Sequence, residues 1–304
     1  MRGGSADVVE TKYADVGTGV TLAFAHAGAG GVPLLLIHGW PETRRIWSRN
    51  IAPLARAGFE VIAPDLRGFG DSSLAEDGCY DPAAYATDLH RLVKGLGHAS
   101  CMAAGGDLGG VVMLDLGLRF PGFVERQCFF NSNPPYVKQV LDAAGVHDDL
   151  PRSKRPSADY FLRQGHEPDK LMAELDTPDL RRRYIASFYT HRLWAGPGGF
   201  TMHDVAFHTE PFADADKLRA SFGSYEVACG TKKPSAVPKL FEIHPVPALV
   251  LYGDADHVVA PTFPAKCAAT FGDVLGPFVV PGAGHFLQWE RAELFNKALA
   301  HFLR

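Results

Sequence analysis

The chain has 304 residues, of which 46% are hydrophobic and 21% are charged. These proportions are typical of an ordinary soluble globular chain with a large core, and the length suggests about two domains. The formal net charge of −4 gives no reason to expect nucleic acid or an acidic membrane as a partner.

Targeting signals and cysteine usage indicate where the protein works. Residues 1–7 lack the apolar core of a secretory signal, and no uninterrupted apolar stretch approaches the length of a membrane span. The five cysteines are scattered, with no C-x-x-C pair and no spacing typical of a metal site. An odd, dispersed set favours reduced thiols. We therefore expect a cytoplasmic protein that has no metal site and no membrane partner.

The first third of the chain alternates apolar runs with helical patterns. Residues 8–16 and 20–27 are expected to form an opening pair of strands. The continuous apolar runs 33–37 and 60–63 are typical of strands buried on both faces of a parallel sheet. Residues 83–96 have the periodicity of an amphipathic helix.

The alternation continues through a short apolar run at 100–104, a helical spacing over 110–120 and a further run at 128–130. It then disappears between about residues 136 and 244, where helical stretches rich in charge and aromatic residues are broken by prolines.

A clean strand pattern returns at 248–252 and is followed by a helix, a strand and a long amphipathic helix over 287–303. Alternating β and α elements imply an α/β fold, with a mainly parallel sheet covered by helices. We expect residues 1–135 and 246–304 to form this core. Residues 136–245 are expected to form a helical cap, inserted after the sixth strand over the carboxyl edge of the sheet, where such sheets bind ligands.

The run Gly105-Gly106-Asp107-Leu108-Gly109 lies between a predicted strand and a predicted helix. A sharp strand-to-helix turn needs glycine on both sides, and the G-x-nucleophile-x-G elbow has this layout, usually with serine at its centre. An aspartate there is already ionised at neutral pH and needs no base to activate it for attack. The ester that it forms must then be hydrolysed with the help of a separate base. The same residues also suit an ordinary turn, since Asp and Gly dominate turns for conformational reasons.

Four further polar motifs follow predicted strands, which brings them to the same edge of the sheet. They are His38-Gly39-Trp40-Pro41, the loop 65–72, Gly253-Asp254-Ala255-Asp256 and Pro281-Gly282-Ala283-Gly284-His285-Phe286. Their coincidence at one edge favours a catalytic site over a set of unrelated turns. The loop 65–72 is expected to be structural, tying a strand to a helix through Arg67 and its glycines.

In this order the motifs H-G-x-P, D-x-R-G-x-G-x-S, G-x-D-x-G, G-x-x-D and G-H-F resemble those of the α/β-hydrolase superfamily over nearly the whole chain. Within that superfamily, the chain resembles the epoxide hydrolases and haloalkane dehalogenases, which use an aspartate nucleophile. The resemblance implies an eight-stranded, mainly parallel sheet with an inserted helical cap. It further implies Asp107 as nucleophile, His285 as base and Asp256 as the acid that orients His285, with Asp254 as the local alternative to Asp256.

The resemblance also assigns the surroundings of the nucleophile. The backbone N–H groups of Trp40 and Leu108 are expected to form an oxyanion hole. His38, Pro41 and Phe286 are expected to contact substrate. One departure is Gly106, where these enzymes often have histidine before the nucleophile.

In the epoxide hydrolases two cap tyrosines hydrogen-bond the ring oxygen and donate the proton that ring opening requires. Tyr225 resembles the second of these tyrosines and Tyr160 the first, while Ser157 and Tyr189 are alternatives for the first. Each of these tyrosines could also be an aromatic of the cap core, anchored by its hydroxyl.

The dehalogenase alternative lacks its usual halide and carboxylate ligands. Many haloalkane dehalogenases place tryptophan directly after the nucleophile, where this chain has Leu108, and others place asparagine at the position of Trp40. Fluoroacetate dehalogenases place arginines at the positions of Leu108 and Val111. A dehalogenase would need an atypical site drawing on residues such as Trp194 or His191.

The sequence therefore predicts an epoxide hydrolase that converts a small-molecule epoxide and water to a vicinal diol without a cofactor. A hydrolase-fold binding protein without turnover is a third interpretation. The sequence leaves open the identity of the epoxide, the regio- and enantioselectivity, the first tyrosine of the pair, and the choice between a monomer and a homodimer.

Overall fold

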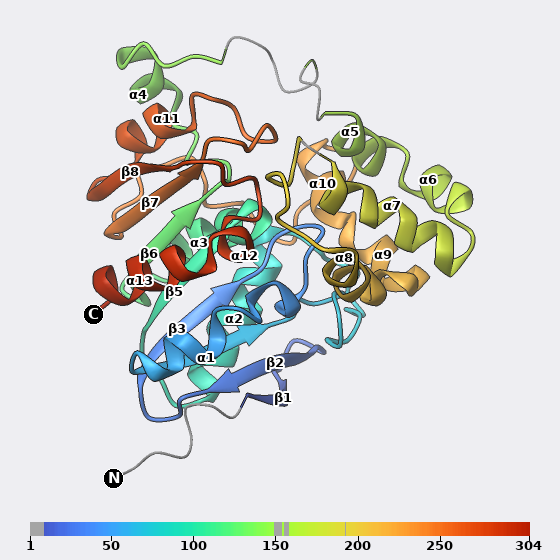
Figure 1. The fold of residues 1–304 in the computed structure, drawn as a ribbon, viewed down its shortest axis with the longest axis horizontal. Helices are drawn as coiled ribbons and strands as arrows, with labels where there is room; N and C mark the ends of the chain where they lie inside the picture. The colour runs from blue at the N-terminus through green and yellow to red at the C-terminus, as the bar shows by residue number, and fades with distance from the viewer. Residues whose placement is uncertain (1–8, 149–153, 155–157, 192) are drawn as a thin grey trace.

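The computed structural model describes residues 9–148, 154, 158–191 and 193–304. Within these residues one eight-stranded sheet runs through the molecule in the order β1-β2-β4-β3-β5-β6-β7-β8 (Figure 1). The strands are β1 Glu10–Asp15, β2 Thr21–Ala27, β3 Val32–Ile37, β4 Phe59–Pro64, β5 Cys101–Gly106, β6 Val124–Phe130, β7 Ala248–Gly253 and β8 Val274–Val280. The pairs β1–β2 and β2–β4 are antiparallel and the remaining pairs are parallel, which confirms the predicted fold class.

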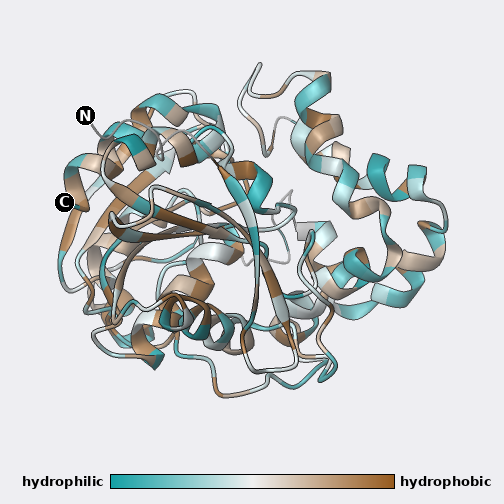
Figure 2. Cartoon of the chain, turned by 90° about the horizontal axis from the view of Figure 1, so that it is seen from below, coloured by the Kyte–Doolittle hydropathy of each residue, from teal (hydrophilic) through white to brown (hydrophobic). Residues whose placement is uncertain are grey.

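Strand burial follows position in the sheet. All six residues of the central strand β4 are buried, as are the last four of β3, whereas the edge strands β1 and β8 are largely exposed. Continuous apolar runs are therefore found where helices cover both faces. In Figure 2 the strands are coloured mainly as hydrophobic, and the helices carry hydrophilic stretches on the outside.

Helices cover both faces of the sheet. Helices α1 and α13 pack together on one face and α2 and α3 on the other (Figure 1). The core helices are α1 Ile51–Arg56, α2 Pro82–Gly95, α3 Asp107–Arg119, α4 Lys138–Ala143, α11 Phe263–Thr270, α12 Leu287–Glu290 and α13 Ala292–Phe302, with a 3₁₀ turn η1 at Arg44–Trp47. No helix among the described residues is long and apolar enough to cross a membrane.

The last helix differs from its prediction. The pattern over 287–303 predicts one helix, but the chain breaks at Arg291, whose φ of −129° and ψ of 42° are not helical. Tertiary contacts explain the break, because the Arg291 guanidinium donates to the Gly282 carbonyl at 2.8 Å and the Glu290 carboxylate turns back toward the same loop. Local periodicity carries no information about either contact.

The cap follows β6 and lies beside the carboxyl edge of the sheet (Figure 1). Its elements are α5 Ala158–His166, α6 Pro168–Glu174, α7 Pro178–Thr190, α8 Met202–Thr209, η3 Glu210–Ala213, α9 Ala215–Ser221 and α10 Gly223–Ala228. Helix α4 lies within the range 136–245 that is expected to form the cap, but it packs on α11 of the core. Asp148, which follows α4, pairs with Lys266 of α11 at 2.7 Å.

Arg181 of α7 is buried, although it lies in a run of three arginines. Its position in a run of three arginines suggests a solvated helix face, but the side chain is 7% exposed. Its guanidinium donates to the carbonyl of Leu175 at 2.8 Å and to that of Ala213 at 2.7 Å, tying α7 to neighbouring cap segments. The next residue, Arg182, has the expected surface role and lies 3.5 Å from Asp179.

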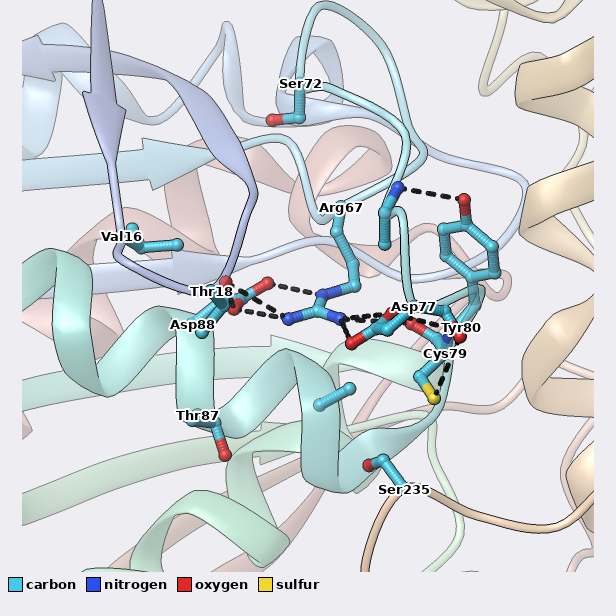
Figure 3. Close-up of polar contacts among 12 residues, drawn as sticks. Val16, Thr18, Arg67, Ser72, Asp77, Cys79, Tyr80, Thr87, Asp88 and Ser235 are labelled. Atoms are coloured by element: carbon cyan, nitrogen blue, oxygen red, sulfur yellow. Dashed lines mark hydrogen bonds and ion pairs between the residues drawn. The ribbon is translucent and has the colours of Figure 1, made fainter.

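The loop after β4 is structural, as predicted. Arg67 is buried and binds Asp88 of α2 through two nitrogens, at 2.5 and 2.6 Å, and Asp77 at 3.1 Å (Figure 3). Removing one partner of a buried ion pair costs about 3–5 kcal/mol, because the other charge is left uncompensated. This pair therefore fixes the loop that passes beneath the cap, where the Ser224 hydroxyl donates to the Tyr80 carbonyl at 2.9 Å.

Candidate active site

Asp107 occupies the turn between β5 and α3, and its φ of 47° is in the left-handed region. This conformation costs a non-glycine residue of order 1–3 kcal/mol and is found mainly at functional sites. Glycines allow other segments to approach it closely. A Cβ on Gly109 would lie 2.2 Å from the Ile37 carbonyl oxygen, and a Cβ on Gly39 would lie 2.7 Å from Asp107 Cβ. The missing side chains thus bring the loop after β3 against the elbow.

The structure brings Asp107, His285 and Asp256 together. His285 Nε2 lies 3.4 Å from Asp107 Oδ2, and His285 Nδ1 lies 2.9 Å from Asp256 Oδ2. Asp256 Oδ1 also accepts from the N–H of Val258 at 2.7 Å, which fixes the carboxylate. The alternative acid, Asp254, points elsewhere and accepts from the N–H of Gly282. The geometry therefore selects Asp256 over Asp254 as the partner of His285.

The pKa values of His285 and Asp107 are both shifted by their surroundings. Burial by itself would lower the pKa of His285, but Asp256 and Asp107 outweigh it and raise that pKa well above its usual value. Burial by itself would raise the pKa of Asp107, yet His285 and the N–H groups of Trp40 and Leu108 hold it below its usual value. The proximity of the two groups, 3.4 Å between His285 Nε2 and Asp107 Oδ2, therefore favours the ionised carboxylate of Asp107, which is the form that can attack a substrate.

Two backbone N–H groups point at the carboxylate of Asp107. The N–H of Trp40 donates to Oδ1 at 2.8 Å. The N–H of Leu108, the residue that follows the nucleophile, also donates to this carboxylate. These are the two groups expected to form an oxyanion hole. The Trp40 indole is engaged separately, since its Nε1–H donates to the Ser221 hydroxyl of the cap at 3.1 Å.

The two predicted tyrosines lie in different places. Tyr225 of α10 lines the cavity that contains Asp107. Tyr160 of α5 lies parallel to the Trp40 ring, with 5.4 Å between centroids, and lines a separate depression with Phe188. The structure therefore brings Tyr225 to the nucleophile and places Tyr160 against the Trp40 ring, outside the described lining of the cavity.

The alternatives to Tyr160 differ in what the structure says of them. Ser157 lies outside the described residues. Tyr189 is 2% exposed and its hydroxyl donates to the carbonyl of Pro41, so it fastens the cap to the loop after β3. Tyr184, another cap tyrosine, accepts from the side chain of Gln164 at 2.9 Å.

The predicted substrate contacts of His38, Pro41 and Phe286 stay predictions, and the structure shows what these residues contact. His38 is buried with both nitrogens engaged: Nδ1–H donates to the Gly39 carbonyl at 2.8 Å and Nε2 accepts from the Leu66 N–H at 3.0 Å. Its ring holds two loops together. Phe286 is fully buried in ring contacts with the cap, and neither it nor Pro41 is among the described residues that line the cavity.

Asn131, at the end of β6, joins all three catalytic loops and was missed in the sequence. Its carbonyl accepts from the Asp107 N–H at 3.0 Å, and its side-chain oxygen accepts from the Gly253 N–H at 3.0 Å. Its amide donates to the carbonyls of Gly284 and His285 at 2.9 and 3.1 Å. In the sequence, the position of Asn131 directly after a predicted strand is the local signal of this role. In the structure its φ of 39° lies in the left-handed region.

One buried glutamate, Glu42, and one half-buried glutamate, Glu290, near the triad were missed as well. Glu42 accepts from the Gly39 N–H at 2.6 Å and from the Gln288 side chain at 2.9 Å. Glu290 accepts from the N–H groups of Gly284 and Gly196, linking the histidine loop to the cap. Each follows a catalytic motif within a few residues, and the neighbouring sequence, which also contains arginines, gives no further signal of this role.

Comparison with known proteins identifies the fold family of the chain. The family model described as alpha/beta hydrolase fold matches residues 32–292. A soluble epoxide hydrolase from a Corynebacterium species is 32% identical over 191 residues, a match that covers 62% of each chain and so under two thirds of that protein. Epoxide hydrolase A of Mycobacterium tuberculosis is 27% identical over 94% of each chain.

Other similar proteins have different names or show the fold alone. A putative non-heme chloroperoxidase of Synechocystis is 26% identical over 94% of this chain and 95% of its own. Among solved structures, the epoxide hydrolase CorEH superposes with a TM-score of 0.81 at 24% identity, covering 98% of this chain and 100% of its own. At that identity the superposition supports the fold.

Proposed function

The chain belongs to the α/β-hydrolase fold family, and from this premise we propose that it is an epoxide hydrolase with Asp107 as its nucleophile. The observation that carries the proposal is an ionised carboxylate at the elbow, held by two N–H groups and facing a histidine that is paired with a second carboxylate. The names of the relatives support the choice of epoxide as substrate.

In the first step, Asp107 attacks an epoxide carbon. Because the Trp40 N–H holds Oδ1, the other oxygen, Oδ2, is the attacking atom. A carbon–oxygen bond forms to Oδ2, the ring carbon–oxygen bond breaks, and the ring oxygen takes a proton from the Tyr225 hydroxyl. Such acid assistance contributes roughly 10²–10⁴-fold to rate. The product is an ester of Asp107 that carries a neighbouring hydroxyl group.

In the second step, His285 activates water. Forming the ester removes the negative charge of Asp107 and with it part of the interaction that raises the pKa of His285. Nε2 is buried with no aligned hydrogen-bond partner among the described residues, so it is available to a water molecule beside the ester. Water gives its proton to Nε2 and its oxygen adds to the ester carbonyl. The N–H groups of Trp40 and Leu108 hold the resulting oxyanion.

Collapse of that intermediate completes the cycle. The bond to the alkyl oxygen breaks, the diol leaves, and Asp107 returns as a carboxylate. The proton on His285 restores the Tyr225 hydroxyl, so one epoxide and one water give one diol. Asp256 stabilises the imidazolium while it exists.

Trapping the ester tests this scheme. His285→Gln puts an uncharged amide in place of the imidazole and so removes the base, and incubation with an epoxide should then raise the protein mass by one epoxide. Asp107→Asn is the matched control and should gain no mass. In a single turnover of the parent in ¹⁸O-water, the label should enter the Asp107 carboxylate and not the diol. Direct entry of the label into the diol would refute the covalent step.

Among the residues that the structure describes, the dehalogenase alternative finds no supporting observation. Leu108 and Val111 present apolar side chains to the cavity, and the Trp40 indole is already bonded to Ser221. His191 accepts from the Leu193 N–H on the cap surface. Halide release from haloalkanes or haloacids, with no diol formed from epoxides, would reverse this choice.

A further inference from the structure

The cavity over Asp107 has an apolar, uncharged lining. Its volume is about 400 Å³, within the usual range for small-molecule sites. Its walls are built mainly from Leu108 and Val111 of α3, Val227 of α10, and Leu240 and Phe241 of the segment that returns from the cap. Among its described lining residues none is cationic, and Asp107 is the one carboxylate. Phe241 is 59% exposed, so the cavity opens to solvent at this end.

A packed set of rings lies over the Trp40 side of the nucleophile. We define the aromatic wall as Trp40, Tyr160, Phe188 and Trp194, which are all buried. Phe188 is 4.8 Å from Trp40 and 4.9 Å from Trp194 between ring centroids, and Tyr160 is 5.0 Å from Trp194. Rings at these separations are in direct contact and leave no room for a substituent between them.

The aromatic wall separates the cavity from a second depression. Tyr225 borders the wall on the cavity side, with 5.4 Å between its ring and that of Trp40. On the far side, Tyr160, Phe188 and Trp194 line a depression of about 240 Å³. The aromatic wall also covers His285, since the Trp194 ring lies edge-on to the His285 ring with 4.8 Å between centroids. Space beside Asp107 among the described residues therefore extends toward Val111 and Phe241 and is closed toward the wall.

We propose that the substrates are terminal epoxides that carry one uncharged apolar substituent, an inference that rests on the proposed function. The substituent lies along Val111, Leu240 and Phe241, and the unsubstituted carbon faces the aromatic wall. An internal epoxide with a chain on each carbon would have to displace packed rings. A carboxylate on the substituent would lose its hydration without gaining a cationic partner and would be repelled by Asp107.

Two isomers test the shape of the site without changing hydrophobicity. The specificity constant kcat/KM of the wild-type enzyme is measured for 1,2-epoxyoctane and trans-4,5-epoxyoctane, with propylene oxide as a small reference that fits any epoxide hydrolase. A pocket that excludes several methylenes should favour 1,2-epoxyoctane by about 100-fold or more. Values within about tenfold of each other would overturn the proposal.

Other outcomes of the same panel are distinct. Turnover of propylene oxide with no preference between the isomers overturns the substrate class but leaves the epoxide hydrolase function standing. Absence of turnover for every epoxide overturns both. Faster turnover of 4-carboxystyrene oxide, a terminal epoxide whose one substituent carries a carboxylate, than of styrene oxide would overturn the requirement for an uncharged substituent.

Paired variants locate the effect at the two sides of the nucleophile. Phe188→Ala removes a ring from the aromatic wall and should raise the ratio of kcat/KM for trans-4,5-epoxyoctane to that for 1,2-epoxyoctane by about tenfold. Val111→Phe fills the open side of the cavity and should lower the kcat/KM for 1,2-epoxyoctane relative to that for propylene oxide. If Phe188→Ala does not fold, Phe188→Leu makes a smaller opening and should shift the ratio in the same direction. Folded wall variants with an unchanged ratio would contradict the assignment.

Discussion

Burial of Glu42 makes this residue a source of instability at neutral pH, which Glu42→Gln should relieve. The side chain is 3% exposed, and burial, with a further contribution from Asp107, raises its pKa from 4.5 to about 7. Glutamine can keep both hydrogen bonds. Its oxygen can accept from the Gly39 N–H, and its amide can donate to Gln288 Oε1, which is buried without a partner among the described residues.

The magnitude follows from the difference in pKa between the folded and unfolded states. A difference of about 2.5 pH units, at about 1.4 kcal/mol per unit, corresponds to about 3 kcal/mol. Between pH 4.5 and 7 the folded protein holds a proton on Glu42 that the unfolded chain has lost, so stability falls as pH rises through this window. The full penalty is present above pH 7 and is absent below pH 4.5. Most of it should accrue between pH 5 and pH 8.

Urea unfolding of the wild type and of Glu42→Gln at these two pH values measures the effect. The variant should gain about 2–3 kcal/mol over the wild type on going from pH 5 to pH 8. Glu76→Gln, a matched change at an exposed glutamate, should show no such gain. A stability difference between the wild type and Glu42→Gln that is equal at both pH values would show that Glu42 is not held in its protonated form, and would refute the reasoning.

Four further predictions concern the site and its support. Asp256→Asn should leave the fold intact but lower kcat by about 10⁴-fold, with ester accumulating in rapid-quench mass spectra; unchanged kcat would remove Asp256 from the triad. Tyr225→Phe should slow ester formation by about 10²–10⁴-fold in pre-steady-state measurements, and no effect there would assign the proton to another group. Asn131→Asp turns two donors into an acceptor facing two carbonyls, so the free energy of unfolding should fall by about 2–5 kcal/mol and kcat should fall more than KM changes. Arg67→Met should cost about 3–5 kcal/mol in urea unfolding by leaving Asp88 unpaired, and a loss below about 1 kcal/mol would contradict its buried role.

The order of elements and the position of the cap could be predicted because they depend on local patterns. The apolar runs that became β3 and β4 are buried on both faces, and burial selects continuous hydrophobicity whatever the distant partners are. The elbow could be recognised from its local motif, although the crowding at Gly109 comes from Ile37 of a neighbouring strand. The break at Arg291 was not predictable, because it depends on contacts with a loop that periodicity does not report.

The sequence by itself determined which residue types could do the chemistry: a carboxylate at an elbow, a histidine after the last strand and tyrosines in the cap. The tertiary structure decided which of them meet. It selected Asp256 over Asp254, placed Tyr225 in the cavity and Tyr160 against the Trp40 ring, and made Asn131 the junction of three loops. The physical reason is distance along the chain. Hydrogen bonds and ring contacts between remote segments depend on how β-strands and cap helices pack, and no local pattern encodes that packing.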